Sequence, residues 1–147
     1  MGRIYTVPYA GTPAAAAVPW VITAGSGRGL RLLGFNLESE AGETDQQIAI
    51  VISTLTGSFT AGTGGTTPTP AKADTDDPAA DFAVRINGTA PTAGTGAKDT
   101  VFRTAQPLRA VVFADPPITV LAAQAISVEV GETAGSACVG TAVIEEM

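Results

Sequence analysis

The feature that most constrains the fold is a period-two alternation of apolar and polar residues along two neighbouring segments, residues 28–37 and 46–54. The apolar sets are Leu33, Phe35 and Leu37 in the first segment, and Ile48, Ile50 and Ile52 in the second. This alternation, with many β-branched residues, is typical of half-buried β-strands. Between them lies a short, turn-rich segment, residues 39–45. We therefore expect these strands to form an antiparallel hairpin at the centre of a β-sandwich.

Short apolar segments of the same kind recur along the chain. They are residues 2–9, 18–24, 82–87, 98–104, 108–114, 118–121, 125–130 and 137–145. Turn residues separate them, and no amphipathic helical pattern is present, so we predict an all-β, antiparallel β-sandwich or jelly roll of about eight or nine strands. The 147 residues form a single domain in this prediction.

Three details of this strand prediction concern particular neighbours. Pro8 limits the first strand to a sheet edge or a strand end, because proline cannot donate a ladder hydrogen bond. We expect residues 98–104 and 108–114 to pair with each other. Along residues 125–130, the alternation predicts that Ser127 and Glu129 point away from the apolar face.

Residues 56–80 interrupt the pattern with a long segment rich in Gly, Thr, Pro, Ala and Asp. Phe59 is its only large apolar residue, and residues 66–70 favour extended, polyproline-like backbone. Loops of this length are uncommon in compact domains. Two interpretations remain open: an arm that lies across a neighbouring subunit, or a mobile surface loop.

The charge of the chain argues against nucleic acid and membranes as partners. The formal net charge is −6, and the eight Lys and Arg residues are scattered rather than clustered as phosphate binding requires. The longest apolar run, residues 14–22, is broken by Pro19 and is shorter than the roughly 20 residues of a membrane-spanning helix. Residues 1–6 lack the apolar core of a signal peptide, so we expect assembly in the cytoplasm.

The chain contains no histidine, which removes the commonest general base, Ser-His-Asp and Cys-His catalysis, and His-containing zinc sites. Cys138 is the single cysteine, so no intrachain disulfide forms, and its small, apolar neighbours indicate a buried thiol in a strand. We find no catalytic constellation and expect a protein that is not an enzyme and needs no cofactor or metal.

Four local motifs have plainer explanations than a binding site. Residues 74–78 and Asp81 resemble the start of a calcium loop but lack its central Gly and terminal Glu. Residues 94–99 miss the Lys and hydroxyl spacing of a phosphate loop, and residues 25–29 miss the dinucleotide fingerprint. The acids of residues 38–45 lie in a turn without the aromatic cleft that a glycosidase needs.

Asn87, in the sequence Asn-Gly-Thr, is a formal glycosylation site but is better explained as a turn residue. Low charge, 15% of residues, together with many Ala, Gly and Thr, suggests that neighbouring subunits cover part of the exterior; an ordinary Ala-rich domain is the alternative. The candidate contact residues are the aromatic residues of the first two strands and four residues of the long loop. They are Tyr5, Tyr9, Trp20, Phe59, Thr67, Pro68 and Pro70, with Trp20 either a core or an interface anchor.

Four segments carry a resemblance to a known family. They are residues 2–9 (Gly-Arg-Ile-Tyr-Thr-Val-Pro-Tyr), 30–35 (Leu-Arg-Leu-Leu-Gly-Phe), 62–70 (Gly-Thr-Gly-Gly-Thr-Thr-Pro-Thr-Pro) and 140–146 (Gly-Thr-Ala-Val-Ile-Glu-Glu). Nearly the whole chain resembles the capsid cement or decoration proteins of tailed bacteriophages, although these motifs are loose and not catalytic. It departs from that family at residues 106–109, where relatives are expected to have an aromatic residue.

The resemblance implies a virion protein on the exterior of the capsid. Such proteins are expected to sit as homotrimers at three-fold and quasi-three-fold positions and to clamp neighbouring major capsid protein subunits. A β-sandwich with little charge suits such an assembly. The exposed edges of its sheets can be paired there, and closed symmetry covers its faces of low charge.

Two alternatives remain from other functional classes. One is a tail or head-fibre component that binds a carbohydrate or host receptor through Trp20, Tyr5 or Tyr9. The other is a calcium-dependent module that uses Asp74 and Asp76.

Overall fold

A computed structural model describes residues 2–14, 17–39, 47–92, 98–105, 109–130 and 137–147, and in this part of the chain every regular element is a β-strand. The strands are β1 (Arg3–Gly11), β2 (Trp20–Thr23), β3 (Leu30–Ser39), β4 (Gln47–Leu55), β5 (Ala71–Lys72), β6 (Ala83–Arg85), β7 (Lys98–Ala105), β8 (Arg109–Val120), β9 (Ala125–Val130) and β10 (Cys138–Glu146). The all-β prediction is therefore confirmed.

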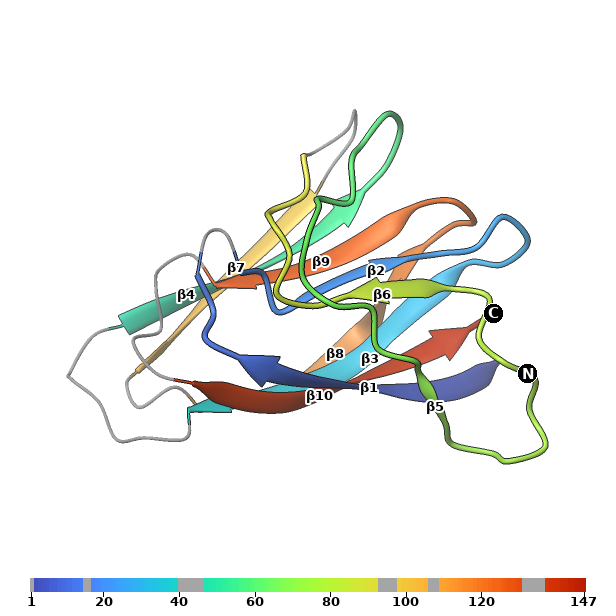
Figure 1. Ribbon diagram of the computed structural model, residues 1–147, viewed down its shortest axis with the longest axis horizontal. Coiled ribbons are helices and arrows are strands. Elements are labelled where there is room, and N and C mark those ends of the chain that lie inside the picture. The colour runs from blue at the N-terminus through green and yellow to red at the C-terminus, as the bar shows by residue number, and fades with distance from the viewer. Residues whose placement is uncertain (1, 15–16, 40–46, 93–97, 106–108, 131–136) are drawn as a thin grey trace.

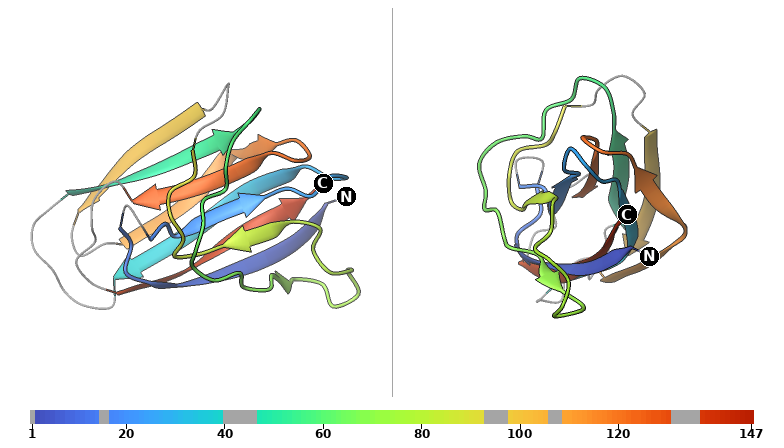
Figure 2. Two further views of the ribbon diagram at one scale, coloured as in Figure 1. Left: turned by 45° about the horizontal axis from the view of Figure 1, so that its top comes forward. Right: turned by 90° about the vertical axis from the view of Figure 1, so that its right-hand side faces the viewer.

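The strands form two antiparallel sheets that face each other as a β-sandwich (Figure 1). The first sheet has the order β5-β1-β10-β3-β8, and the second has the order β6-β2-β9-β4-β7. Most connections pass from one sheet to the other, while the long segment after β4 runs along the outside of one flank (Figure 2). The two ends of the described chain lie side by side, because Arg3 pairs with Glu146.

The predicted central hairpin is wrong, because β3 and β4 belong to different sheets. β3 lies between β10 and β8, and β4 lies between β9 and β7. Alternation shows which side of a strand is buried but not which strand lies beside it. A connection of seven residues (40–46) can span roughly 23 Å, more than the ~10 Å between packed sheets. The predicted pairing of residues 98–104 with 108–114 is wrong for the same reason, since β7 and β8 are edge strands of different sheets.

The prediction that Leu33 shares a face with Phe35 and Leu37 is wrong, because β3 has a β-bulge at Leu33. The register with β10 skips Leu33, since Val143 pairs with Gly34 and the next residue, Ile144, pairs with Leu32. An extra residue in one strand reverses the direction of the side chains beyond it. Leu30 and Leu32 therefore point into the core before the bulge and Phe35 and Leu37 after it, while Leu33 is half-buried.

Trp20 joins the two sheets at the centre of the core. Its ring lies 5.4 Å from that of Tyr9 on β1 and 5.7 Å from that of Phe35 on β3, measured between ring centroids. Trp20 comes from β2 in the second sheet, so these tilted aromatic contacts cross the sandwich. The predicted burial of Cys138 is also confirmed, since its side chain is fully buried on β10.

Ser127 lies on the side of β9 opposite Ile126, Val128 and Val130, as the alternation predicts, but this side is covered as well. Its side chain is 0% exposed, and Glu129 is half-buried. β9 is the central strand of the second sheet, where Ser127 pairs with Val21 on one side and Ser53 on the other. Both neighbours are buried as well, at 2% and 7% exposed.

Asn87 forms the turn that ends the β6 region, as the sequence predicts. Its φ of 55° lies in the left-handed region that asparagine tolerates better than most residues. Its backbone N–H donates to Val18 O at 2.8 Å, and its side-chain Nδ2 donates to Ala10 O at 2.9 Å. The turn thus ties the end of β1 to the start of β2.

Candidate functional site

The side of β1 and β10 that faces away from the second sheet forms a surface of mainly small and apolar residues. We call it the outer face, and it consists of Ile4, Thr6, Pro8, Ala10, Val139, Thr141, Val143 and Glu145. The alternation that buries Tyr5, Val7 and Tyr9 directs their even-numbered neighbours outwards. Register then places Thr6 beside Val143 and Ala10 beside Val139, so the two strands form one continuous surface.

Two exposed large hydrophobic side chains lie on this outer face. Ile4 is 38% exposed and Val139 is 42% exposed, whereas Leu121, also exposed, lies outside this face, between β8 and β9. Glu145, the register partner of Ile4, is the one charged residue on this side of β1 and β10. It pairs with Arg31 at 3.2 Å, so their charges offset each other. An exposed surface with apolar residues and little charge is a common feature of protein interaction sites.

The long loop packs on its own chain, which bears on the two interpretations of residues 56–80. Residues 60–66 run antiparallel to residues 86–92, with hydrogen bonds from Thr66 N to Ile86 O at 3.0 Å and from Thr89 N to Thr63 O at 2.8 Å. The Arg85 side chain donates to Gly64 O at 2.5 Å. This part of the loop is therefore an ordered, hydrogen-bonded layer on its own chain.

Residues 71–81, which we call the strap, continue from this layer along the edge of the first sheet. β5 pairs with Tyr5 and Thr6 of β1, and Ala73 N donates to Ile4 O at 2.9 Å. β5 ends after these two pairs, and beyond them β1 has no strand on that side among the described residues, in line with the edge position that Pro8 predicts.

Two side chains of the first sheet hold the far end of the strap. The Tyr5 hydroxyl donates to Pro78 O at 3.0 Å, and the Glu146 carboxylate accepts from Asp81 N at 2.6 Å. Tyr5 also contacts Phe82 edge-on, with ring centroids 5.3 Å apart. Burial, followed by the nearby Glu146 charge, raises the pKa of Tyr5 above its ordinary range, so its hydroxyl keeps the proton that it donates.

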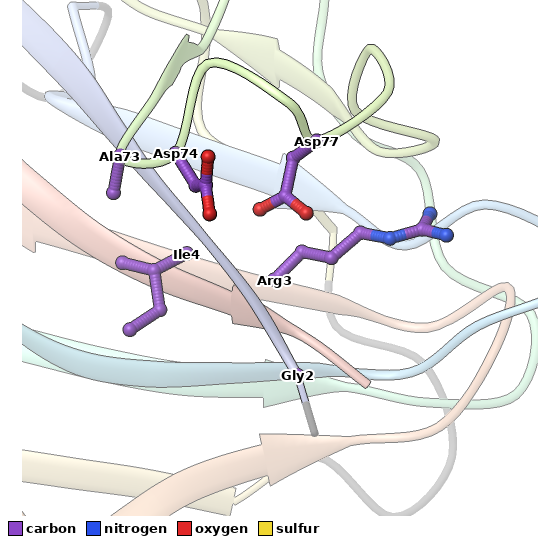
Figure 3. A pocket seen from close by; sticks show the side chains of 6 residues that line it. All are labelled: Gly2, Arg3, Ile4, Ala73, Asp74 and Asp77. Atoms are coloured by element: carbon purple, nitrogen blue, oxygen red, sulfur yellow. The ribbon is translucent and has the colours of Figure 1, made fainter.

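A pocket of about 400 Å³ lies between the strap and the first residues of β1 (Figure 3). It is lined by Gly2, Arg3, Ile4, Ala73, Asp74 and Asp77. The carboxylates of Asp74 and Asp77 face the same space, and the Arg3 guanidinium is directed away from them (Figure 3). The pocket borders the outer face, because Ile4 belongs to both.

The predicted contact residues divide into two groups. Tyr5, Tyr9 and Trp20 are 0%, 3% and 0% exposed, so a partner outside this chain cannot reach them, and we remove them from the candidate surface. Alternation identified the shared side of Tyr5 and Tyr9 correctly, but that side faces the core. Thr67 is exposed, and Phe59, Pro68 and Pro70 are half-buried on the loop, outside the outer face and the pocket.

Sequence reasoning missed the residues that form the outer face and the pocket. Ile4 and Val139 were visible as apolar residues on the side of their strands opposite Tyr5 and Cys138, which was the available signal. No local signal joins Ile4 to Asp77, because more than 70 residues separate them. Three segments that the sequence motifs include lie outside the described residues. They are residues 40–45, which hold Glu40, Glu43 and Asp45, and residues 94–97 and 106–108.

Comparison with protein-family models, with curated proteins and with solved structures finds no match to this chain. Within the described residues, no three Cys, Asp or Glu side chains are grouped so that they could hold a metal ion. In the same part of the chain, no helix has the length and apolar character needed to cross a bilayer.

Proposed function

We propose that this chain is a non-enzymatic structural protein of a bacteriophage particle, which binds the outside of the head as a homotrimer and bridges major capsid protein subunits. The observation that carries the proposal is the outer face of β1 and β10, where Ile4 and Val139 are exposed and the one charged residue, Glu145, is paired with Arg31. Such a surface suits a permanent contact with another protein.

The positions of the family-like segments support this proposal. Residues 2–9 and 140–146 coincide with β1 and β10, which lie side by side, and residues 30–35 begin β3, the next strand. Three of the four segments are thus adjacent in one sheet, and two of them form the outer face. The fourth, residues 62–70, belongs to the layer that the long loop builds on the same subunit.

We also infer that the eight longer strands form a jelly roll. Without β5 and β6, the sheets have the orders β1-β10-β3-β8 and β2-β9-β4-β7, four strands each. Jelly rolls contain eight strands in two sheets and occur in viral capsid domains as well as in lectins. Because one fold serves several functions, the architecture agrees with the proposal without selecting it. The carbohydrate-binding alternative relied on Tyr5, Tyr9 and Trp20, which are buried, so we do not propose it.

Reconstruction of intact particles tests the location, and removal of the protein tests the role. We expect density for three copies around three-fold positions on the outside of the shell. Shells without the protein should lose their DNA at a lower temperature, and adding purified protein should restore their resistance. Absence of the protein from purified particles, or shells of unchanged stability after its removal, would overturn the proposal.

A further inference from the structure

We propose that the pocket between β1 and the strap receives a lysine or arginine side chain of a protein partner. The inference rests on the proposed function for the identity of that partner, the shell. The kind of side chain follows from the pocket alone, which has an anionic end formed by Asp74 and Asp77 and an apolar wall formed by Ile4 and Ala73. The pocket would then anchor the partner at the border of the outer face.

The charge of the pocket favours a cationic group. Asp74 and Asp77 both direct carboxylates into it (Figure 3), and neither forms an ion pair with a described residue. Arg3, the lining cation, is already engaged, because its Nη1 lies 3.4 Å from the Glu146 carboxylate, which is 1% exposed. Lys72 lies next to Ala73 in the chain but does not line the pocket. A net charge of −6 also favours a basic partner surface.

The size and the wall of the pocket favour a long side chain over a metal ion. A calcium ion needs about six to eight oxygen ligands at roughly 2.3–2.6 Å, whereas this pocket has about 400 Å³ and two carboxylates. Lysine and arginine place an alkyl stem on apolar surface and a charge at its end. Ile4 is 38% exposed and provides such surface beside the two carboxylates.

The pocket is also held in shape by hydrogen bonds within the chain, so a ligand would find it largely formed. Ala73 N donates to Ile4 O at 2.9 Å, which fixes one wall to the other. Asp74 Oδ1 accepts from Asp76 N at 3.0 Å, and Asp77 N donates to Asp74 O at 3.2 Å, which together shape the turn that carries both acids. Preorganised sites lose less conformational entropy on binding.

Amide NMR titration of the isolated protein tests the pocket without the shell. The probes are Nα-acetyl-lysine methylamide and Nα-acetyl-arginine methylamide, with the norleucine analogue as the uncharged control and calcium chloride as the metal. We expect both cationic probes to shift the amides of Arg3, Ile4, Ala73 and Asp77, and the norleucine analogue to leave them unchanged. Equal shifts with norleucine, shifts with calcium alone, or no localised shift would overturn the inference.

Variants connect the pocket to the shell and separate the two proposals. The double variant Asp74→Asn/Asp77→Asn removes the charge but keeps the oxygen that accepts from Asp76 N; Asp76→Asn is the control, because Asp76 does not line the pocket. We expect the double variant to bind protein-free shells about tenfold more weakly, and the control to bind normally. Equal binding by the wild type, the double variant and the control would overturn the inference about the pocket, while the proposed function stands. If the wild type itself does not bind shells, the proposed function fails, and the NMR titration still decides the pocket.

Discussion

The carboxylate of Glu146 accepts a hydrogen bond from the backbone N–H of Asp81 at 2.6 Å, although 65 residues separate the two. Glu146 is the last residue of β10, is 1% exposed, and also lies 3.4 Å from Arg3 on β1. A single buried carboxylate therefore fastens the end of the strap to two neighbouring strands of the first sheet. Buried charges are stable in proteins when they are paired in this way.

Replacement of Glu146 by alanine is expected to lower the free energy of unfolding by about 2–3 kcal/mol, because the backbone N–H of Asp81 and the Arg3 guanidinium both lose their partner. The control is Glu145→Ala, which removes the more exposed pair with Arg31 and should cost less than about 1 kcal/mol. Urea denaturation measures both. Equal losses in the two variants would contradict the role assigned to the buried carboxylate.

Tyr5 and Tyr9 form a matched pair for testing how much the hydrogen bond of a buried hydroxyl contributes to stability. The Tyr5 hydroxyl donates to Pro78 O at 3.0 Å, whereas the Tyr9 hydroxyl is buried without a hydrogen-bond partner among the described residues. Tyr5→Phe should lose about 1 kcal/mol of stability, and Tyr9→Phe should leave stability unchanged or slightly raise it. Thermal melts at neutral pH distinguish the two. A larger loss from Tyr9→Phe would contradict this assignment of hydrogen bonds.

The same tyrosines predict a loss of stability at high pH. Burial is the main cause that raises the pKa of both side chains in the folded protein, above the ordinary 10.0. The stability that their neutral hydroxyls contribute is fully present below pH 10 and declines above it. Above pH 10 these hydroxyls ionise in the unfolded chain, while they stay neutral in the folded chain. Urea denaturation between pH 8 and pH 11 should therefore show falling stability. Tyr9→Phe should reduce the slope above pH 10, and an unchanged slope would contradict the effect of burial.

The local structure of the strands was predictable from the sequence, but their pairing was not. The alternation along β1 correctly placed Tyr5 and Tyr9 on one side, because successive side chains of a regular strand point to opposite sides. Whether β3 lies beside β4 or beside β10 depends on contacts between distant segments. The bulge at Leu33 likewise arises where β3 meets both neighbours, β10 and β8, so no pattern within β3 reveals it.

The candidate site depends even more on distant contacts. Trp20 and the two tyrosines were attractive as contact residues because aromatic residues are common in interfaces. In this chain they fill the core of a sandwich that has few other aromatic side chains, since aromatics are 5% of the sequence. The pocket forms only when the strap lies against β1, and this arrangement is fixed by Tyr5 and Glu146, neither of which lies in the strap.

Gly62 and Gly64 separate backbone strain from steric contact in the layer formed by the long loop. Their φ values are similar, +78° and +74°, so alanine at either position is strained by roughly 1–2 kcal/mol. A Cβ at Gly62 would lie 2.2 Å from Thr89 O, whereas a Cβ at Gly64 would meet nothing within 4 Å. Gly62→Ala should therefore destabilise the protein more than Gly64→Ala does. Urea denaturation measures the difference, and equal losses would contradict the close packing of residues 60–66 on residues 86–92.

Val139 and Leu121 provide the sharpest test of the outer face. Both are exposed apolar residues, 42% and 66% exposed, but Val139 lies on the outer face and Leu121 lies between β8 and β9. Lysine at either position should be tolerated by the fold, because its charge remains in water. If the outer face contacts the shell, Val139→Lys places a charge in that contact and should weaken binding to protein-free shells by about tenfold or more. Leu121→Lys should bind like the wild type. Co-sedimentation with shells measures both, and normal binding by Val139→Lys would show that the shell is contacted through another surface.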